Sequence, residues 1–175
     1  GLGEGGGGGG GGEDGLAGCG GGGSSLPQIS PLGKLWSYNN AGFSLSGRVI
    51  EAVTVHSFEE AAKELLFAPL GMKMSFFYPG DMMTHRFAVG HTLSHGEPTQ
   101  EAIVATPWPL ARSVNPAGGV SSTVIDMLRY AQFHLSKGRT EQGEQLLQPA
   151  TIAAMQTRQA EAGSMAAAVG LSWML

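Results

Sequence analysis

The sequence has a single cysteine, little net charge and no long apolar run, and each shortage excludes a class of protein. Cys19 has no second cysteine to pair with, so no internal disulfide can form. The formal net charge of −4 provides no basic surface for nucleic acid or for an anionic membrane. No run of about 18 apolar residues is present, so we expect no membrane span.

Glycine, in contrast, is concentrated at the start of the chain. Residues 1–25 are mostly glycine, have almost no side chains to bury and would lose the most backbone entropy on ordering. We expect a disordered segment there, followed by a partial domain at residues 26–175. A phosphate-binding loop is not expected, because no strand precedes the run and no Lys-Ser/Thr ending follows. Cys19 is interpreted as a free thiol, and no secretory signal is visible.

The first predicted helix spans residues 41–53. Asn40 is its expected N-cap, because an amide side chain can accept hydrogen bonds from the free N–H groups of the first turn. Apolar residues recur at a spacing of three to four, which predicts one apolar stripe along the helix. Gly42 and Gly47 interrupt the pattern, which indicates close packing against another element. The expected stripe is Leu45, Val49 and Val53, flanked by Phe43 and Ile50.

The second and fourth predicted helices have clear start signals. The second begins at a capping box, in which the Ser57 hydroxyl and the Glu60 carboxylate each accept a backbone N–H of the other residue. It ends at the turn of residues 69–72. The fourth begins at Pro149, a favoured first-turn residue. In the second helix the apolar residues at helical spacing are Phe58, Ala61, Ala62 and Leu65. In the fourth helix the expected buried residues are Ile152 and Met155.

The third predicted helix begins after its N-cap, Thr123. Asp126 is a first-turn carboxylate, and Arg129 three residues on is placed to pair with it. The expected buried stripe is Val124, Leu128, Ala131 and Leu135. Elsewhere we expect mainly loop, with turns at residues 79–80 and 116–119, loop throughout residues 97–116, a short strand at residues 87–89 and the beginning of a strand at residues 169–175.

A histidine group is the one candidate for metal binding. His91 and His95 have the four-residue spacing of a zinc-binding helix, and His85 lies nearby in sequence. Glycines bracket the pair and no His-Glu start is present, so we expect no metal site and no cofactor. The methionines are interpreted as core and turn residues. They are Met72, Met74, Met82 and Met83.

Four motifs stand in order along the chain. They are Tyr38-Asn39-Asn40-Ala41-Gly42-Phe43, Arg48-Val49-Ile50-Glu51, Phe67-Ala68-Pro69-Leu70-Gly71-Met72, and Pro116-Ala117-Gly118-Gly119-Val120-Ser121-Ser122-Thr123 with Asp126. None is specific alone. Together they resemble the β-lactamase-related serine hydrolases, which include class C β-lactamases, penicillin-binding DD-peptidases and family VIII esterases, over roughly residues 26–175.

The resemblance implies an α+β fold (α/β in the broad sense), with a helical region packed on an antiparallel sheet. This chain would carry mostly the helical part and little of the sheet. Apolar helix faces that cover a sheet in the family would then be exposed here, in patches above the ~400 Å² at which association begins. Val55 stands where the family usually has glycine, just past a helix end.

The resemblance also implies three catalytic elements, of which this chain matches one. Tyr38 and Asn40 match the Tyr-x-Asn element and are the candidate catalytic residues. The Ser-x-x-Lys and Lys/His-Thr-Gly elements do not occur, since no lysine here has a serine three residues before it. We expect both elements to be encoded beyond the two ends of this chain, which would make it a fragment that is inactive alone.

In such an enzyme the tyrosine transfers protons. A free tyrosine has a pKa near ~10 and is a poor base, but neighbouring ammonium groups favour its phenolate. Tyr38 would relay the serine proton to the leaving group, and Asn40 would hold the lysine and the substrate amide. The substrate of the full-length protein would be a β-lactam, peptide or ester. A non-catalytic binding or regulatory protein that retains the helical half is the alternative. Family members are often periplasmic or secreted, with cytoplasmic exceptions, so no compartment is assigned.

Overall fold

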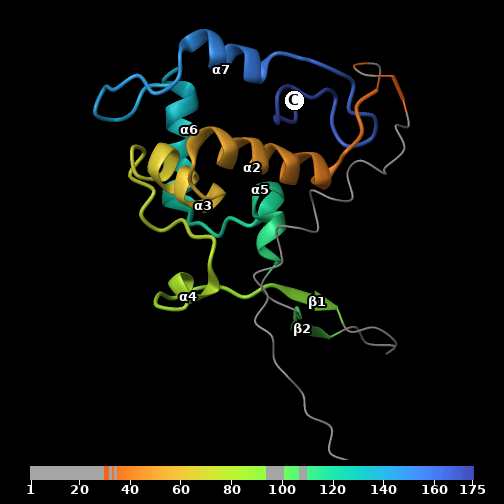
Figure 1. Cartoon of the computed structure of the whole chain (residues 1–175). Helices are drawn as coiled ribbons and strands as arrows, with labels where there is room; N and C mark the ends of the chain where they lie inside the picture. The colour runs from red at the N-terminus through yellow and green to blue at the C-terminus, as the bar shows by residue number, and fades with distance from the viewer. Residues whose placement is uncertain (1–29, 32, 34, 94–100, 107–109) are drawn as a thin grey trace, which may run out of the picture.

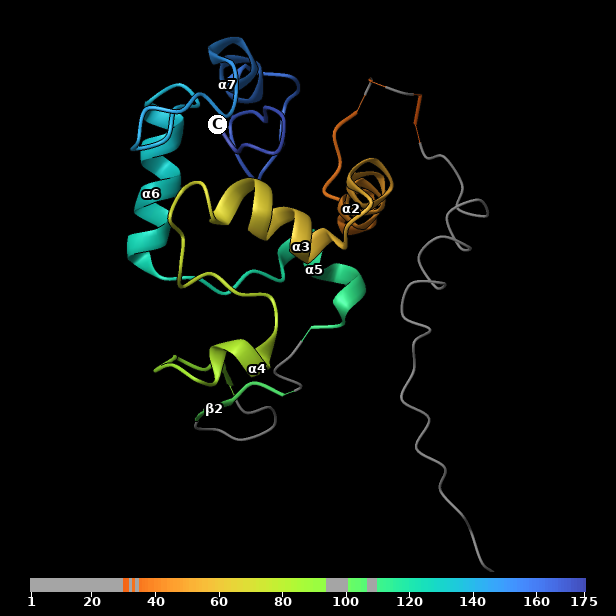
Figure 2. The ribbon, with the colours of Figure 1, turned by 60° about the vertical axis from the view of Figure 1, so that its left-hand side comes forward.

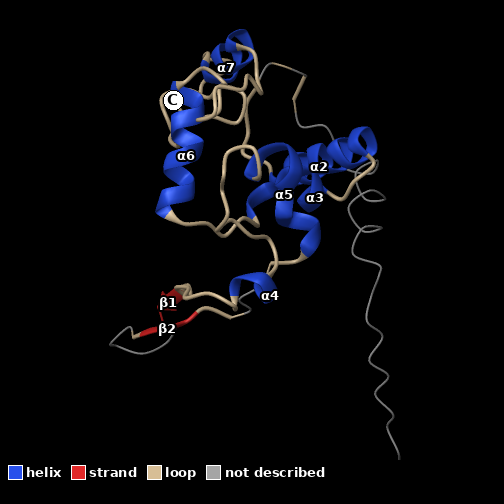
Figure 3. Ribbon diagram, turned by 90° about the vertical axis from the view of Figure 1, so that its left-hand side faces the viewer, coloured by secondary structure: helices blue, strands red, loops and turns tan. Residues whose placement is uncertain are grey.

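The computed structural model describes residues 30, 31, 33, 35–93, 101–106 and 110–175. The glycine-rich stretch, Cys19 and His95 lie outside the described residues. Helices predominate in the described part (Figure 3). In chain order the elements are α2 (Asn40–Thr54), α3 (Phe58–Ala62), the π-helix η3 (Lys63–Phe67), α4 (Pro79–Met82), β1 (His91–Leu93), β2 (Ala102–Val104), the 3-10 helix η4 (Arg112–Val114), α5 (Asn115–Gly118), α6 (Val124–Leu135) and α7 (Pro149–Gln156).

The helices form the body of the molecule and the two strands lie at one end of it. Helix α7 lies at the end opposite to β1 and β2, with α2 between them (Figure 1). Helix α3 lies between α6 and α2 (Figure 2). The strands pair antiparallel, with His91 opposite Val104 and Leu93 opposite Ala102. Within the described residues, no helix has both the length and the apolar character that crossing a membrane requires.

Helix α2 confirms the predicted element, but its N-cap is shifted by one residue. Asn39, with φ −149°, is the cap, and its Oδ1 accepts hydrogen bonds from the N–H groups of Ala41 (2.9 Å) and Gly42 (3.4 Å). The prediction of Asn40 as the cap was therefore wrong. Asn40 is the first helical residue, and its side chain has no hydrogen-bond partner among the described residues.

The apolar stripe of α2 faces outward, as expected for helix faces that cover a sheet in the related family. The helix packs through its small residues instead: Ser44 and Gly47 are its buried positions, and a Cβ at Gly47 would overlap the Pro116 ring of α5. The glycine thus allows the close approach that the sequence indicated, and this contact turns the larger apolar side chains away. The exposed residues are Leu45, Val49 and Val53, which are 57% to 77% exposed, with Phe43 and Ile50 beside them.

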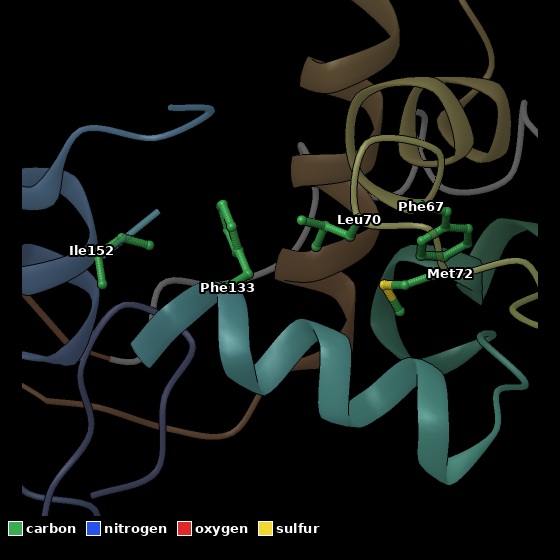
Figure 4. Packing of buried hydrophobic residues seen from close by; sticks show 5 residues of the cluster. All are labelled: Phe67, Leu70, Met72, Phe133 and Ile152. Carbon is green, nitrogen blue, oxygen red and sulfur yellow. The ribbon is translucent and has the colours of Figure 1, made fainter. Parts of the chain in front are cut away.

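Helix α6 also presents its apolar stripe to solvent, and here the prediction of a buried stripe was wrong. The predicted stripe is exposed, and the buried residues of the helix are Asp126, Phe133 and His134. Phe133 joins the main core cluster, which connects the end of η3 to α6 and α7 (Figure 4). The members of the exposed stripe are Val124, Leu128, Ala131 and Leu135. The core cluster is Phe67, Leu70, Met72, Phe133 and Ile152.

The prediction for α3 was correct at its start and wrong at its end. The capping box is present, with the Ser57 Oγ accepting from the Glu60 N–H and the Glu60 Oε2 accepting from the Ser57 N–H at 3.0 Å. Beyond Ala62 the chain continues as the π-helix η3, which has more residues per turn than an α-helix. The wider turn changes the direction in which the following side chains point around the helix axis. Phe67 is therefore buried and Leu65 is exposed.

The connecting segments contain more structure than expected. Pro79 begins the short helix α4, where a turn was predicted, and a proline suits this first position because it has no N–H to leave unpaired. The expected strand at residues 87–89 is absent, and β1 begins at His91 instead. The expected loop at residues 97–116 contains β2, η4 and the start of α5. Helix α5 takes the place of the turn predicted at residues 116–119.

The carboxyl-terminal segment is anchored by a ring contact. Residues 169–175 form isolated bridges rather than the expected strand, with Val169 opposite both Ala160 and Met174. Trp173 places its ring 4.7 Å from the buried ring of His134. The prediction for α7 is confirmed, since it begins at Pro149 and buries Ile152.

The end of α2 yields a test of backbone strain. Val55 closes the helix in the left-handed region, with φ 60° and ψ 22°, and is 88% exposed. Because a β-branched residue is strained there and little burial is lost, Val55→Gly should raise the free energy of unfolding by about 1 kcal/mol. Val53→Gly, in the right-handed part of the same helix, should lower it by about 0.5 kcal/mol. Urea denaturation of both variants measures these changes in the free energy of unfolding. Changes of the same sign and size in the two variants would contradict the strain argument.

The outward apolar stripe of α2 predicts self-association. On a sizing column the protein should elute at increasing apparent mass as its concentration rises, since adjacent apolar side chains form a contiguous patch. Replacing Leu45 and Val49 by Lys should shift the elution toward the monomer. Thr151→Lys, at an exposed polar site on α7, is the control and should leave elution unchanged. A concentration-independent monomer would contradict the prediction.

Candidate functional site

The two candidate catalytic residues lie on either side of the α2 N-cap. Tyr38 is in the extended segment that enters the helix and is 54% exposed. Asn40 is exposed in the first turn. Because Asn39 supplies the cap, the Asn40 amide is not occupied by capping. The fold therefore leaves a phenol and an amide exposed at the same helix end.

The position of α2 is set by two contacts further along the helix. The Glu51 Oε1 accepts a hydrogen bond from the N–H of Phe58, the first residue of α3, at 3.1 Å. Arg48 pairs with the same carboxylate from within α2. At Gly47 the backbone lies against Pro116 of α5. These contacts attach α2 to α3 and α5, so the orientation of its N-terminal end depends on both.

A buried carboxylate connects α3 to η4 and α5. Glu59 is 5% exposed and accepts hydrogen bonds from Arg112 Nε (3.3 Å), Arg112 Nη2 (3.1 Å) and Asn115 Nδ2 (2.7 Å). Burial by itself raises the pKa of this carboxyl, but the donors of Arg112 and Asn115 outweigh it and hold the pKa below its usual value. Burial, with Glu59 nearby, raises the pKa of the Tyr78 phenol. At neutral pH Glu59 and Arg112 are therefore ionised and paired, and the Tyr78 phenol is neutral.

The sequence pattern around Glu59 does not indicate this cluster. Glu59 lies inside the capping box, where an acidic residue is ordinary, and its partners are 53 and 56 residues away. No local pattern joins such distant residues. The only available signal was Asn115, which directly precedes the Pro-Ala-Gly-Gly motif.

A second buried carboxylate confirms one prediction and extends it. Asp126 pairs with Arg129, Oδ1 to Nη1 at 2.7 Å, as expected. It is also 0% exposed, and its Oδ2 accepts from the Met74 N–H (2.7 Å) and the Ser75 hydroxyl (3.0 Å). The Ser75 Oγ lies 2.8 Å from the Ser122 Oγ. Asp126 thus attaches the loop after η3 to the start of α6.

The histidines of the metal hypothesis are not brought together in the described part of the chain. The ring of His85 stacks on Phe76 at 5.3 Å, and His91 lies in β1. His95 lies outside the described residues. Among the residues that are described, no group of three or more His, Cys, Asp or Glu is placed to hold a metal ion.

Comparison with known proteins gives a consistent family. A family model described as Beta-lactamase matches residues 23–175. Penicillin-binding protein 4 of Amycolatopsis lactamdurans is 33% identical over 159 residues, 87% of this chain and 40% of that protein. A beta-lactamase of Yersinia enterocolitica is 31% identical over 147 residues, 84% of this chain and 34% of that protein. The chain thus spans well under half the length of these two relatives.

Solved structures show the same fold. An octameric penicillin-binding protein homologue from Pyrococcus abyssi superposes with a TM-score of 0.69 at 24% identity, over 82% of this chain and 30% of that one. A beta-lactamase from Sulfitobacter sp. EE-36 gives a TM-score of 0.55 at 27% identity, over 77% and 34% of the two chains. The expected serine β-lactamase and penicillin-binding protein fold is confirmed, here as a helix-rich part with one two-stranded antiparallel sheet in the described residues.

The Glu59 cluster predicts a pH-dependent contribution to stability. Glu59→Ala should lower the free energy of unfolding by about 2–3 kcal/mol at pH 7, because charge-assisted hydrogen bonds are lost and Asn115 is left unpaired. The folded-state pKa lies below the usual 4.5. The stabilisation is therefore present above pH 4.5 and lost as pH falls through the folded pKa.

Denaturation at pH 7 and at pH 3 measures this difference. The difference in free energy of unfolding between the wild-type protein and Glu59→Ala should be smaller at pH 3 than at pH 7. Glu64→Ala is the control, because that carboxylate is exposed and lies 3.9 Å from His56. A gap that does not change with pH would show that the loss comes from packing rather than from charge.

Proposed function

Because this chain belongs to the Beta-lactamase family, we propose that it is part of a serine hydrolase that acts through an acyl-enzyme. The substrate of the whole protein is a β-lactam, a peptide or a small ester. Relatives named penicillin-binding protein and beta-lactamase support this range. Since the chain spans 40% and 34% of those relatives, the activity belongs to a longer protein.

One observation carries the proposal: the phenol and the amide of the Tyr-x-Asn motif are both uncommitted. An aromatic residue at the start of a helix usually packs against the core, but Tyr38 is more than half exposed. A helix-start asparagine usually caps, but Asn39 performs that task here. Packing and capping therefore do not account for these residue types, and a role toward a bound substrate does.

The proposed chemistry follows from the two side chains. A hydrolase serine must lose a proton as it attacks the carbonyl, and the leaving group must gain one. Tyr38, with its phenolate favoured by a nearby ammonium group, accepts the first proton and donates the second. Asn40 presents an amide oxygen to that ammonium group and an amide N–H to the substrate. The serine and lysine are supplied from outside this chain, which is therefore inactive alone.

The second candidate function is a non-catalytic binding or regulatory protein with the same helical half. It is favoured by the fact that no lysine of this sequence follows a serine at the Ser-x-x-Lys spacing. In that case Tyr38 and Asn40 contact a ligand without transferring protons. The two candidates differ in whether a serine in the longer product becomes acylated.

The 175-residue chain should hydrolyse neither a chromogenic cephalosporin nor a p-nitrophenyl ester above the buffer rate. The longer product encoded with its flanking sequence should react with a covalent serine probe and hydrolyse one of these substrates. In that product Tyr38→Phe should lower kcat/KM by about 100-fold or more, the usual contribution of a general acid–base.

Tyr130→Phe is the control, because that phenol packs beside His134, with 4.6 Å between the ring centroids, away from the α2 N-terminus. It should retain full activity. Turnover by the 175-residue chain that Tyr38→Phe abolishes would disprove the need for outside residues. A longer product that the probe does not label would favour the binding protein.

A further inference from the structure

A narrow crevice lies between α2 and the elements that pack against it, α3, η4 and α5. Its volume is about 20 Å³. That exceeds the roughly 10–15 Å³ that a single water molecule requires and is far below the roughly 300 Å³ at which typical small-molecule sites begin. The crevice therefore admits a ligand of one heavy atom.

Two serine hydroxyls that line this crevice are unused. Ser44 of α2 is 7% exposed, and Ser113 of η4 is half-buried. Neither side chain forms a hydrogen bond with any residue in the described part of the chain. There, every buried side-chain oxygen or nitrogen that is closed to solvent has a partner, so the Ser44 hydroxyl must reach a space that water can enter. A buried hydroxyl without a partner is unfavourable, which favours a ligand in the crevice.

The charged side chains that line the crevice form two ion pairs. Arg48 pairs with Glu51 within α2, and Arg112 pairs with Glu59 across η4 and α3. The four formal charges cancel, so the lining favours neither a cation nor an anion. Water is the neutral molecule of this size that both donates and accepts hydrogen bonds, and it is therefore the ligand that fits.

The crevice also offers the number of partners that a buried water needs. Such a water makes about three hydrogen bonds. Besides the two hydroxyls, the Glu51 carboxylate lines the crevice. Its Oε1 accepts from the Phe58 N–H at 3.1 Å and its Oε2 accepts from Arg48. Each carboxylate oxygen can accept a further hydrogen bond, so Glu51 can serve as the third partner.

We propose that this crevice binds one water molecule, which connects α2 to η4 by bridging the hydroxyls of Ser44 and Ser113, with Glu51 as its third partner. Ser44 lies one helical turn after Asn40. The water therefore supports the end of α2 that carries the Tyr-x-Asn residues. The site stands on the crevice and its hydroxyls alone and does not depend on the proposed hydrolase activity.

Crystal structures of the 175-residue protein and of Ser44→Val locate the water. The wild-type protein should show one density peak within about 3.2 Å of both serine Oγ atoms. Ser44→Val replaces the hydroxyl by methyl groups that fill the crevice, so the peak should be absent from that variant. The proposal is overturned by a wild-type structure without the peak, or by a peak that remains in Ser44→Val.

Urea denaturation tests the bridge in solution. Ser44→Ala should raise the equilibrium constant for unfolding about fivefold, because the water loses a partner. Ser46→Ala is the matched control: that serine is exposed on the same helix and donates to the Gly42 carbonyl at 3.0 Å. It should not raise the constant, since alanine is the better helix former.

The effects of the two bridging serines should not add. Ser113→Ala should raise the unfolding constant less in the Ser44→Ala protein than in the wild-type protein, because the bridge is already broken there. In the Ser46→Ala protein it should have its full effect. Full additivity of Ser44→Ala and Ser113→Ala, or a Ser44→Ala protein as stable as Ser46→Ala, would overturn the proposal.

Discussion

The arrangement of the helices depends on the burial of one carboxylate. Glu59 is removed from water and must be paired, because an unpaired buried charge is strongly unfavourable. Its donors come from Arg112 and Asn115, so α3 can fold only with η4 and α5 against it. Helix α5 in turn presents Pro116 to Gly47 of α2. The orientation of α2, and with it the accessible end that carries the Tyr-x-Asn residues, follows from this sequence of contacts.

A second buried carboxylate organises the other side of the molecule in the same way. Asp126 joins α6 to the loop at Met74 and Ser75, next to the core that Phe133 shares with α7. In both places charge pairing sets the contact and the apolar residues follow it. The larger apolar side chains of α2 and α6 face outward although both helices are well formed.

Hydrogen bonding also decides which polar groups remain available at the surface. At the start of α2, capping by Asn39 leaves an amide and a phenol available. Beside η3, pairing with Arg112 offsets the charge of Glu59, and Lys63 and Lys73 balance the charges of Glu60 and Asp81. The polar chemistry of each surface therefore depends on the hydrogen bonds and ion pairs beside it.

The sequence by itself determined the features that depend on neighbours within about four residues. These are the limits of α2 and α7, the capping box at Ser57, the cap at Thr123, the Asp126–Arg129 pair and the order of motifs that identifies the family. Only the tertiary structure decided which helix faces are buried, the phase change in η3 and the partners of Glu59. The reason is physical: caps and short-range ion pairs are completed within one or two turns, whereas burial depends on which distant segment covers a face, and a periodic stripe does not specify that segment.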